Sequence, residues 1–326
     1  MLVNQRNITG QAIPNGDQYA VSIGPTNCFI ADRWLVYRDG WATGGTMSNL
    51  ACTTSDLPFT QDGLTNYIRI GRSDGATNGV NVCQHLETIN SKPLAGKTMT
   101  LSFYARKGAT FSSSGSAMFQ RVWCGILTDK SLPKEGLGTG STNSENSTAL
   151  TQNWTKYTFT VTIPSTTTQL AISFSYTPTG SSSVTDYMDI TGIQFEKGSI
   201  ATPFEFRPYQ IELQLCQRYF ETIAYFRTVG CGCFTAGSAF MGANVFFKVS
   251  KRNASYSARI APMNTVLSYT GAWTNQVYVH TQGGEGTFAA SYGGSTDFIS
   301  VNTSLSGSAV GVFGMFTFSY VVDNEL

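Results

Sequence analysis

Short segments in which apolar and polar residues alternate recur along most of the chain. The alternation is clearest over residues 99–105, 157–163 and 170–176, and a period of two is typical of a strand with one buried face. The apolar positions of these segments are Met99, Leu101, Phe103, Ala105, Tyr157, Phe159, Val161, Ile163, Leu170, Ile172, Phe174 and Tyr176. They predict antiparallel strands in a two-sheet sandwich, so the expected fold class is all-β.

Two polar stretches interrupt this pattern. Residues 39–63 consist mostly of Gly, Asp, Thr and Ser around Trp41, and residues 132–150 are almost free of large apolar side chains. Such composition predicts exposed loops between strands.

The stretch from Asp189 to Glu221 divides the chain. It begins as a strand, turns at Glu196-Lys197-Gly198, and continues as a connector that contains two prolines. Pro208 suits a first helical position because its missing N–H would have no partner there. Beyond it, apolar residues at helical spacing predict a short helix: Ile211, Leu215 and Tyr219. A helix this short is marginal alone, so its apolar side is expected to pack on the following domain or on copies of itself.

Three regions follow from this division. Residues 1–200 are expected to form the first sandwich, residues 201–221 the linker with its helix, and residues 222–326 a distal β-sandwich domain. In the last strand of the distal domain, near residues 310–321, both faces are apolar. A strand with two apolar faces indicates either a central position in a sheet or burial against another subunit, and we favour the second interpretation.

The composition of the chain limits the classes of molecule that it is expected to bind. Charged residues make up 13% of the chain, against roughly 25% in ordinary globular proteins, and the formal net charge is only +1. No global basic field is therefore available to attract DNA or anionic lipid, and nucleic-acid binding is not expected. Met1 to Gly10 lack the apolar core of a secretory signal, and no apolar run is long enough to cross a bilayer.

The seven cysteines form no CxxC pair, and the close pair Cys231 and Cys233 falls on one face of a predicted strand. Free thiols are therefore expected, which fits a protein folded in a reducing cytoplasm.

Several segments together resemble fibre-type virion proteins of bacteriophages and prophages. The resemblance lies in FEKGSIATPFEFRPY followed by ELQLCQRYF at the junction, NCFIADRW near the start, NWTKYTFTVTIP at residues 153–164, and the terminal FSYVVDNEL. It implies an N-terminal jelly roll like those of carbohydrate-binding modules, a short linker helix and a distal β-sandwich. It also implies a homotrimer with the residues from Arg207 to Glu221 near the threefold axis, placed in the virion beside other virion proteins after assembly in the host cytoplasm.

The same resemblance implies one possible metal ligand and no obligatory cofactor. Asp189, in DYMDITGIQFEKG, is similar to an aspartate that joins a structural calcium site in jelly rolls of the carbohydrate-binding type. The alternative is that Asp189 accepts hydrogen bonds from backbone amides at a strand end.

Catalytic signatures are sparse. The chain has two histidines, His85 and His280. Its one GxSxG match, Gly71-Arg72-Ser73-Asp74-Gly75, lies between two predicted strands and not at the strand-to-helix turn of a nucleophile elbow. Paired carboxylates of a glycan-degrading enzyme remain possible, because their spacing in sequence carries no information.

Aromatic residues offer the more promising chemistry. Sugar rings stack on Trp or Tyr, and neutral polar side chains can bind their hydroxyl groups. Four aromatic residues in or beside polar loops are candidate glycan contacts: Tyr37, Trp41, Trp273 and Tyr292. Trp34 and Trp154 match structural positions of the family and are expected to pack in the fold.

The sequence therefore predicts a non-enzymatic, structural and adhesive virion appendage that binds host cell-surface glycans and does not insert into membranes. A glycan-degrading tail enzyme with a binding module is the first alternative. A capsid decoration protein without a receptor is the second.

Overall fold

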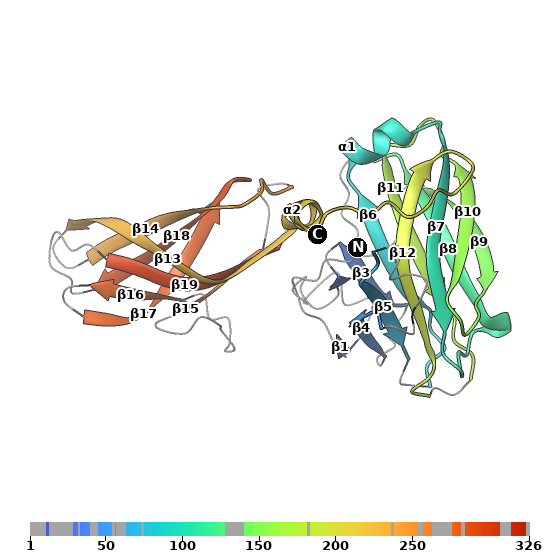
Figure 1. The fold of residues 1–326 in the computed structure, drawn as a ribbon. Helices are drawn as coiled ribbons and strands as arrows, with labels where there is room; N and C mark the ends of the chain where they lie inside the picture. The colour runs from blue at the N-terminus through green and yellow to red at the C-terminus, as the bar shows by residue number, and fades with distance from the viewer. Residues whose placement is uncertain are drawn as a thin grey trace. The chain divides into compact units, whose positions relative to one another are not determined.

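The structure is a computed structural model. It describes residues 11–12, 29–31, 33–39, 45–53, 56, 63–72, 75–127, 140–180, 183–235, 238–252, 257–262, 276–281, 284–306 and 314–323. The chain divides into two compact units, Met1–Glu212 and Leu213–Glu325, and almost all regular structure in both is β-strand (Figure 1).

The first unit contains two antiparallel sheets of six strands each. In spatial order, the first sheet comprises β1 (Gln11–Ala12), β4 (Thr46–Ala51), β5 (Asn66–Gly71), β12 (Tyr187–Lys197), β7 (Thr98–Lys107) and β10 (Thr155–Thr162). The second comprises β2 (Phe29–Ala31), β3 (Trp34–Arg38), β6 (Val80–Leu86), β11 (Gln169–Tyr176), β8 (Ala117–Gly125) and β9 (Thr142–Ala149). From β5 to β12 the chain crosses repeatedly between the two sheets, which gives a jelly-roll sandwich, and α1 (Thr88–Ser91) adds one short helical turn (Figure 1).

The core lies between these two sheets and contains the apolar side chains that the period-two alternation predicted to be buried. Every apolar position named for residues 99–105, 157–163 and 170–176 either belongs to the buried cluster or packs against it. The strand prediction for these segments is confirmed, because burying one face of each strand removes its apolar side chains from water.

Both polar stretches predicted as loops contain a strand. Residues 46–51 form β4, and residues 142–149 form β9 at the edge of the second sheet. β9 is polar because an edge strand with both faces near water needs no apolar stripe, so its sequence lacks the usual signal.

Buried arginines fix the loop between β5 and β6. Arg72 donates to the Asp186 carboxylate over 3.0 Å and to the Ala76 carbonyl over 2.9 Å, and Arg38 donates to that same carbonyl over 3.0 Å. The loop is therefore anchored to both sheets, and Asn78 and Gly79, just before β6, are hydrogen-bonded to Arg38 and Asp39 at the end of β3.

The connector after β12 is fastened to the first unit. Glu196 accepts hydrogen bonds from the backbone N–H of Thr202 over 2.9 Å and from its hydroxyl over 2.6 Å. Gln194 accepts one from the Glu205 N–H over 2.7 Å. The predicted extended linker is thus an ordered strap along its own strand.

The predicted helix is confirmed as α2 (Tyr209–Gln217), immediately after Pro208. Its C-terminal carbonyl, on Gln217, accepts a hydrogen bond from the buried Lys251 ammonium, which also pairs with Glu221 over 2.8 Å. Burial lowers the pKa of Lys251, while the Glu221 carboxylate opposes that change.

Among the described residues, no helix is long and apolar enough to span a membrane.

The second unit is a seven-stranded arrangement of β13 (Phe220–Thr235), β14 (Ser238–Phe246), β18 (Phe298–Ser306), β17 (Gly284–Gly294), β16 (Gln276–Thr281), β19 (Gly314–Asp323) and β15 (Ser257–Pro262). β13, the first strand in this order, also pairs with β19, so the strands from β13 to β19 form a closed ring of hydrogen-bonded neighbours. β19 pairs with β13 on one side and with β15 and β16 on the other. The last strand is therefore central in its sheet, so its two apolar faces do not require the second subunit that the sequence interpretation favoured.

Candidate functional site

The outer face of the second sheet carries a regular array of polar and aromatic side chains. Along β8, Met118 and Val122 join the core, whereas Arg121 and Trp123 alternate with them and lie on the opposite face. On β11, which runs beside β8, the corresponding outer positions hold only small side chains: Ala171, Ser173 and Ser175.

Strand register aligns this array into rows across the sheet. One row runs Leu35, Cys83, Ser173, Arg121 and Glu145 from β3 to β9. The next runs His85, Ala171, Trp123 and Asn143. Larger side chains on the flanking strands therefore border the small side chains of β11, which are buried.

A cleft of about 360 Å³ lies over this face. Its lining comes from β6, β8, β9, the end of β11, the residue after β3 and the loop before β6: Asp39, Gly79, Asn81, Arg121, Trp123, Asn143, Glu145, Ser175, Tyr176 and Thr177. The cleft falls wholly within the first unit, and its size is at the lower end of that of small-molecule sites.

Hydrogen bonds fix the two largest side chains of the cleft. The Trp123 indole Nε1 donates to the Ser173 hydroxyl over 3.1 Å. Arg121 donates from Nε to Glu145 and from Nη1 to the Ser175 hydroxyl over 2.6 Å, and its guanidinium lies 5.4 Å from the Phe119 ring centre. The indole and guanidinium are thus positioned before any ligand arrives.

Asn81 is the residue whose geometry points most clearly to a ligand. Its side chain lines the cleft although the residue is only 2% exposed. Within the part of the chain that the structure describes, its Nδ2 has no hydrogen-bond partner. A buried amide without a partner is costly, so a ligand acceptor at this position would recover a lost interaction.

Gly79 brings the backbone close to the Asp39 carboxylate on the same wall. A Cβ at Gly79 would lie 2.3 Å from Asp39 Oδ2, which is closer than any real contact. The Asp39 N–H also donates to the Gly79 carbonyl over 2.9 Å, so glycine permits this approach.

The four aromatic residues proposed from the sequence have different outcomes. Tyr37 lies on the same outer face, but it is 1% exposed and packs with Leu35 and Cys83, so it cannot offer a ring to a sugar. This corrects its assignment as a glycan contact, and the physical reason is that its ring completes a small apolar cluster. Trp41 and Trp273 lie outside the described residues. Tyr292 lies in β17, and its side chain is likewise outside them.

Trp34 and Trp154 pack in the fold, as expected. Trp34 belongs to the core and lies 6.3 Å from Phe174 between ring centres. Trp154 lies edge-on to Tyr67 and donates from Nε1 to Asp56 over 2.8 Å.

Asp189 lies on the outer face of the first sheet and is fully buried. Arg69 forms a two-pronged pair with it, from Nε to Oδ1 over 2.7 Å and from Nη2 to Oδ2 over 2.8 Å. Arg106 donates to Oδ2 over 2.8 Å. Hydrogen bonding to Asp189 raises the pKa of Arg69, which keeps the guanidinium charged.

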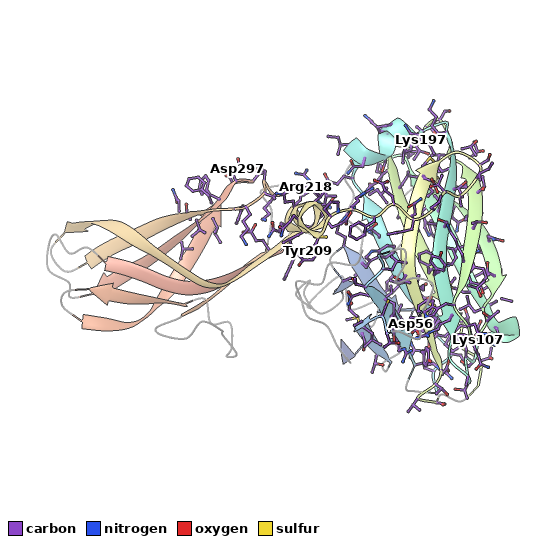
Figure 2. All side chains as sticks on the ribbon, in the orientation of Figure 1. Asp56, Lys107, Lys197, Tyr209, Arg218 and Asp297 are labelled. Atoms are coloured by element: carbon purple, nitrogen blue, oxygen red, sulfur yellow. The ribbon has the colours of Figure 1, made fainter. Side chains whose placement is uncertain are left out.

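The same network continues through Asp56, which is labelled among the side chains of the first unit in Figure 2. Asp56 accepts hydrogen bonds from Arg106 over 3.0 Å and from Trp154. Burial alone would raise the pKa of Asp56, but hydrogen bonds from Thr53 and Trp154 bring it below its usual value. The two guanidiniums also stack on aromatic rings, Arg69 at 3.6 Å from the Tyr187 centre and Arg106 at 4.5 Å from the Trp154 centre.

This network corrects the expectation of a structural calcium ion at Asp189. Both carboxylate oxygens already accept charge-assisted hydrogen bonds, and two guanidiniums supply the positive charge that a cation would bring. Among the described residues, no group of three or more His, Cys, Asp or Glu side chains could hold a metal ion. The alternative of backbone amide donors is also superseded, because the donors are arginines of neighbouring strands.

The three helix residues proposed for oligomerisation are not equivalent. Ile211 and Leu215, one turn apart on α2, are 50% and 41% exposed, whereas Tyr219 is buried. Tyr219 therefore packs within its own chain and is not presented to a partner.

No family model matches the sequence, and no curated protein matches it. Solved structures with a similar fold include the enzymatically active domain of tailspike protein 4 of bacteriophage CBA120, with 11% identity and a TM-score of 0.35 over 51% of this chain and 19% of that one.

Others include a CBM4 structure, with 17% identity and a TM-score of 0.34 over 51% of this chain and 88% of that one. A family 11 carbohydrate-binding module of the cellulase Lic26A-Cel5E of Clostridium thermocellum has 12% identity and a TM-score of 0.32 over 52% of this chain and 90% of that one.

Proposed function

We propose that the first unit binds a glycan in the cleft on the outer face of the second sheet. We further propose that the chain serves as a non-enzymatic bacteriophage virion appendage that attaches to host-surface glycans. The observation that carries the first proposal is the buried, unpartnered Asn81 amide in a cleft that also contains the fixed Trp123 indole.

This combination suits a sugar for two reasons. The C–H face of a pyranose stacks on an indole. The Trp123 indole is already held by its hydrogen bond to Ser173, so it loses little further conformational freedom when a sugar binds. Hydroxyl groups can both donate and accept, so they can satisfy the Asn81 and Asn143 amides together with the exposed carboxylates.

The virion context rests on the sequence resemblance around residues 195–220 and at both ends of the chain. It is supported by the ordered strap and α2, which occupy the junction that the resemblance marks. Placement in the virion, beside other virion proteins, follows from that resemblance alone.

A glycan-degrading enzyme is the competing function, because Asp39 and Glu145 both line the cleft. Hydrolysis needs two carboxyl groups that face each other across the scissile bond, with one available as an acid. Glu145 is instead ion-paired with Arg121 and 42% exposed, which suits a binding surface better. Release of reducing ends from a bound polysaccharide would favour the enzyme.

Gly79→Ala tests the cleft without removing a functional group. The added methyl must displace the Asp39 carboxylate from its position in the lining, so we expect affinity for a bound polysaccharide to fall roughly tenfold. Because the displaced group is the end of a flexible side chain, the free energy of unfolding should change by less than about 1 kcal/mol. Affinity electrophoresis in gels that contain the polysaccharide measures the first effect, and thermal denaturation measures the second.

Gly75→Ala is the matched control. Gly75 belongs to the same loop, and a Cβ there meets nothing within 4 Å. Equal affinity of the two variants would remove the cleft from consideration, whether or not glycan binding itself occurs.

We also propose that the chain is a homotrimer that buries the exposed side of α2. Ile211 and Leu215 are large, apolar and half exposed, and contact between copies would remove them from water. The double variant Ile211→Ser/Leu215→Ser is expected to convert three chain masses to one in light scattering at micromolar concentration. Ile89→Ser, which changes an exposed isoleucine at α1, should leave the mass unchanged. A monomeric native chain would overturn this proposal.

A further inference from the structure

We infer that the cleft selects its ligand by charge: it accepts uncharged oligosaccharides and rejects acidic ones. This inference rests on the proposed glycan-binding function and adds the class of ligand. It starts from the charged groups of the lining, which are the Arg121 guanidinium and the carboxylates of Asp39 and Glu145. One positive and two negative charges leave the cleft with a net charge of −1.

The single guanidinium is already engaged. Arg121 directs Nε to the Glu145 carboxylate and Nη1 to the Ser175 hydroxyl. An acidic sugar is best held by the two-pronged arrangement in which a guanidinium gives two parallel N–H groups to one carboxylate. Glu145 occupies that role within the protein, so a ligand carboxylate would have to compete with it.

The unpartnered amide lies close to the second carboxylate. Asn81 Nδ2 and Asp39 Oδ2 lie 3.7 and 2.3 Å from the same point, the position of a Cβ on Gly79, so they are at most 6.0 Å apart. A ligand acceptor that satisfies Asn81 therefore lies within about 9 Å of the Asp39 charge, since a hydrogen bond adds about 3 Å to that distance. A hydroxyl or acetamide oxygen pays no penalty there, whereas an anionic group is repelled by roughly tenfold in affinity at an intermediate effective dielectric.

The chain as a whole provides no long-range attraction for acidic polymers. The whole chain carries a formal net charge of only +1, so no broad positive potential draws acidic polymers to the surface. Selection is thus left to the residues of the cleft.

The experiment compares matched polymers with the full-length chain. Binding to dextran, galactan and xylan, and to the carboxymethyl derivative of each, is measured by affinity electrophoresis at low and high salt. We expect the native chain to bind at least one neutral polymer, and to bind its carboxymethyl form at least tenfold more weakly at low salt. Added salt should narrow the difference, because it screens the repulsion.

Asp39→Asn/Glu145→Gln tests the residues responsible. It changes the cleft charge from −1 to +1 while keeping oxygen acceptors, and we expect the ratio of carboxymethyl to neutral affinity to rise at least tenfold. Glu205→Gln/Asp297→Asn is the control: it makes the same change in total charge at exposed carboxylates outside the cleft, and should leave the ratio within about twofold of the native value.

The outcomes separate the two proposals. Tighter binding of the carboxymethyl polymer by the native chain would overturn charge selection and leave glycan binding intact. An equal rise in the ratio for both double variants would also overturn it, because the effect would then come from total charge. A folded native chain that binds none of the six polymers would overturn both proposals.

Discussion

Replacing Trp123 by alanine should remove most of the affinity of the native chain for its glycan. The indole is the large flat surface of the cleft, and Ser173 holds it in place. Loss of such a central aromatic contact costs about 2–3 kcal/mol, or roughly 30- to 150-fold in affinity. Isothermal titration with the oligosaccharide derived from the best-binding polymer measures the loss.

Trp123→Phe is the matched control for this variant. Phenylalanine keeps a ring for stacking but cannot donate to Ser173, so its affinity should fall between those of the native chain and Trp123→Ala. Trp123 is half-buried, and both variants should therefore remain folded in thermal denaturation. Native-like affinity of Trp123→Ala would place the glycan elsewhere.

Replacing Asp189 by alanine should produce the largest loss of stability in the first unit. The change leaves the Arg69 and Arg106 guanidiniums without the carboxylate that accepts three of their hydrogen bonds. Removing one partner from a buried ionic network costs about 3–5 kcal/mol, which is a large part of the 5–15 kcal/mol by which domains are usually stable. Urea denaturation followed by tryptophan fluorescence measures the change, since Trp154 lies in the same network.

Two further variants separate charge from volume. Asp189→Asn keeps the shape of the side chain but removes its charge. It should lower the free energy of unfolding nearly as much as Asp189→Ala does. Asp39→Ala, at an exposed aspartate, should change the free energy of unfolding by no more than about 0.5 kcal/mol. A cost below about 1 kcal/mol for Asp189→Asn would show that the arginines need no carboxylate there.

The sequence alone predicted the framework of the first unit but not its cleft. Period-two alternation identified the strands of the core, because burial constrains every second residue of each. The cleft depends instead on register: Trp123 meets Ala171, 48 positions later in sequence, and Asn143 joins the same row. The alternation of β8 does place Arg121 and Trp123 on one face, but nothing local reveals that the β11 residues paired with them, Ser173 and Ala171, are small.

The site residues that were misplaced share a related cause. The resemblance that suggests calcium at Asp189 rests on the residues next to it in sequence, but its hydrogen-bond partners lie 120 and 83 positions away on β5 and β7. Tyr37 has the right chemistry beside a polar loop, yet Leu35 and Cys83 surround it once β3 pairs with β6. The sequence of β9 is polar throughout, because an edge strand needs no apolar face. Its residues, including Asn143 and Glu145, were therefore predicted to lie in a loop.

The decisive measurement uses the five tryptophans of the chain as reporters. With 5-fluorotryptophan incorporated, each gives its own ¹⁹F resonance, and single Trp→Phe variants assign them. On titration with a neutral oligosaccharide, the Trp123 resonance should shift and saturate, while those of Trp34 and Trp154 stay in place. Saturable shifts at Trp41 or Trp273 with none at Trp123 would contradict a binding site on the outer face of the second sheet.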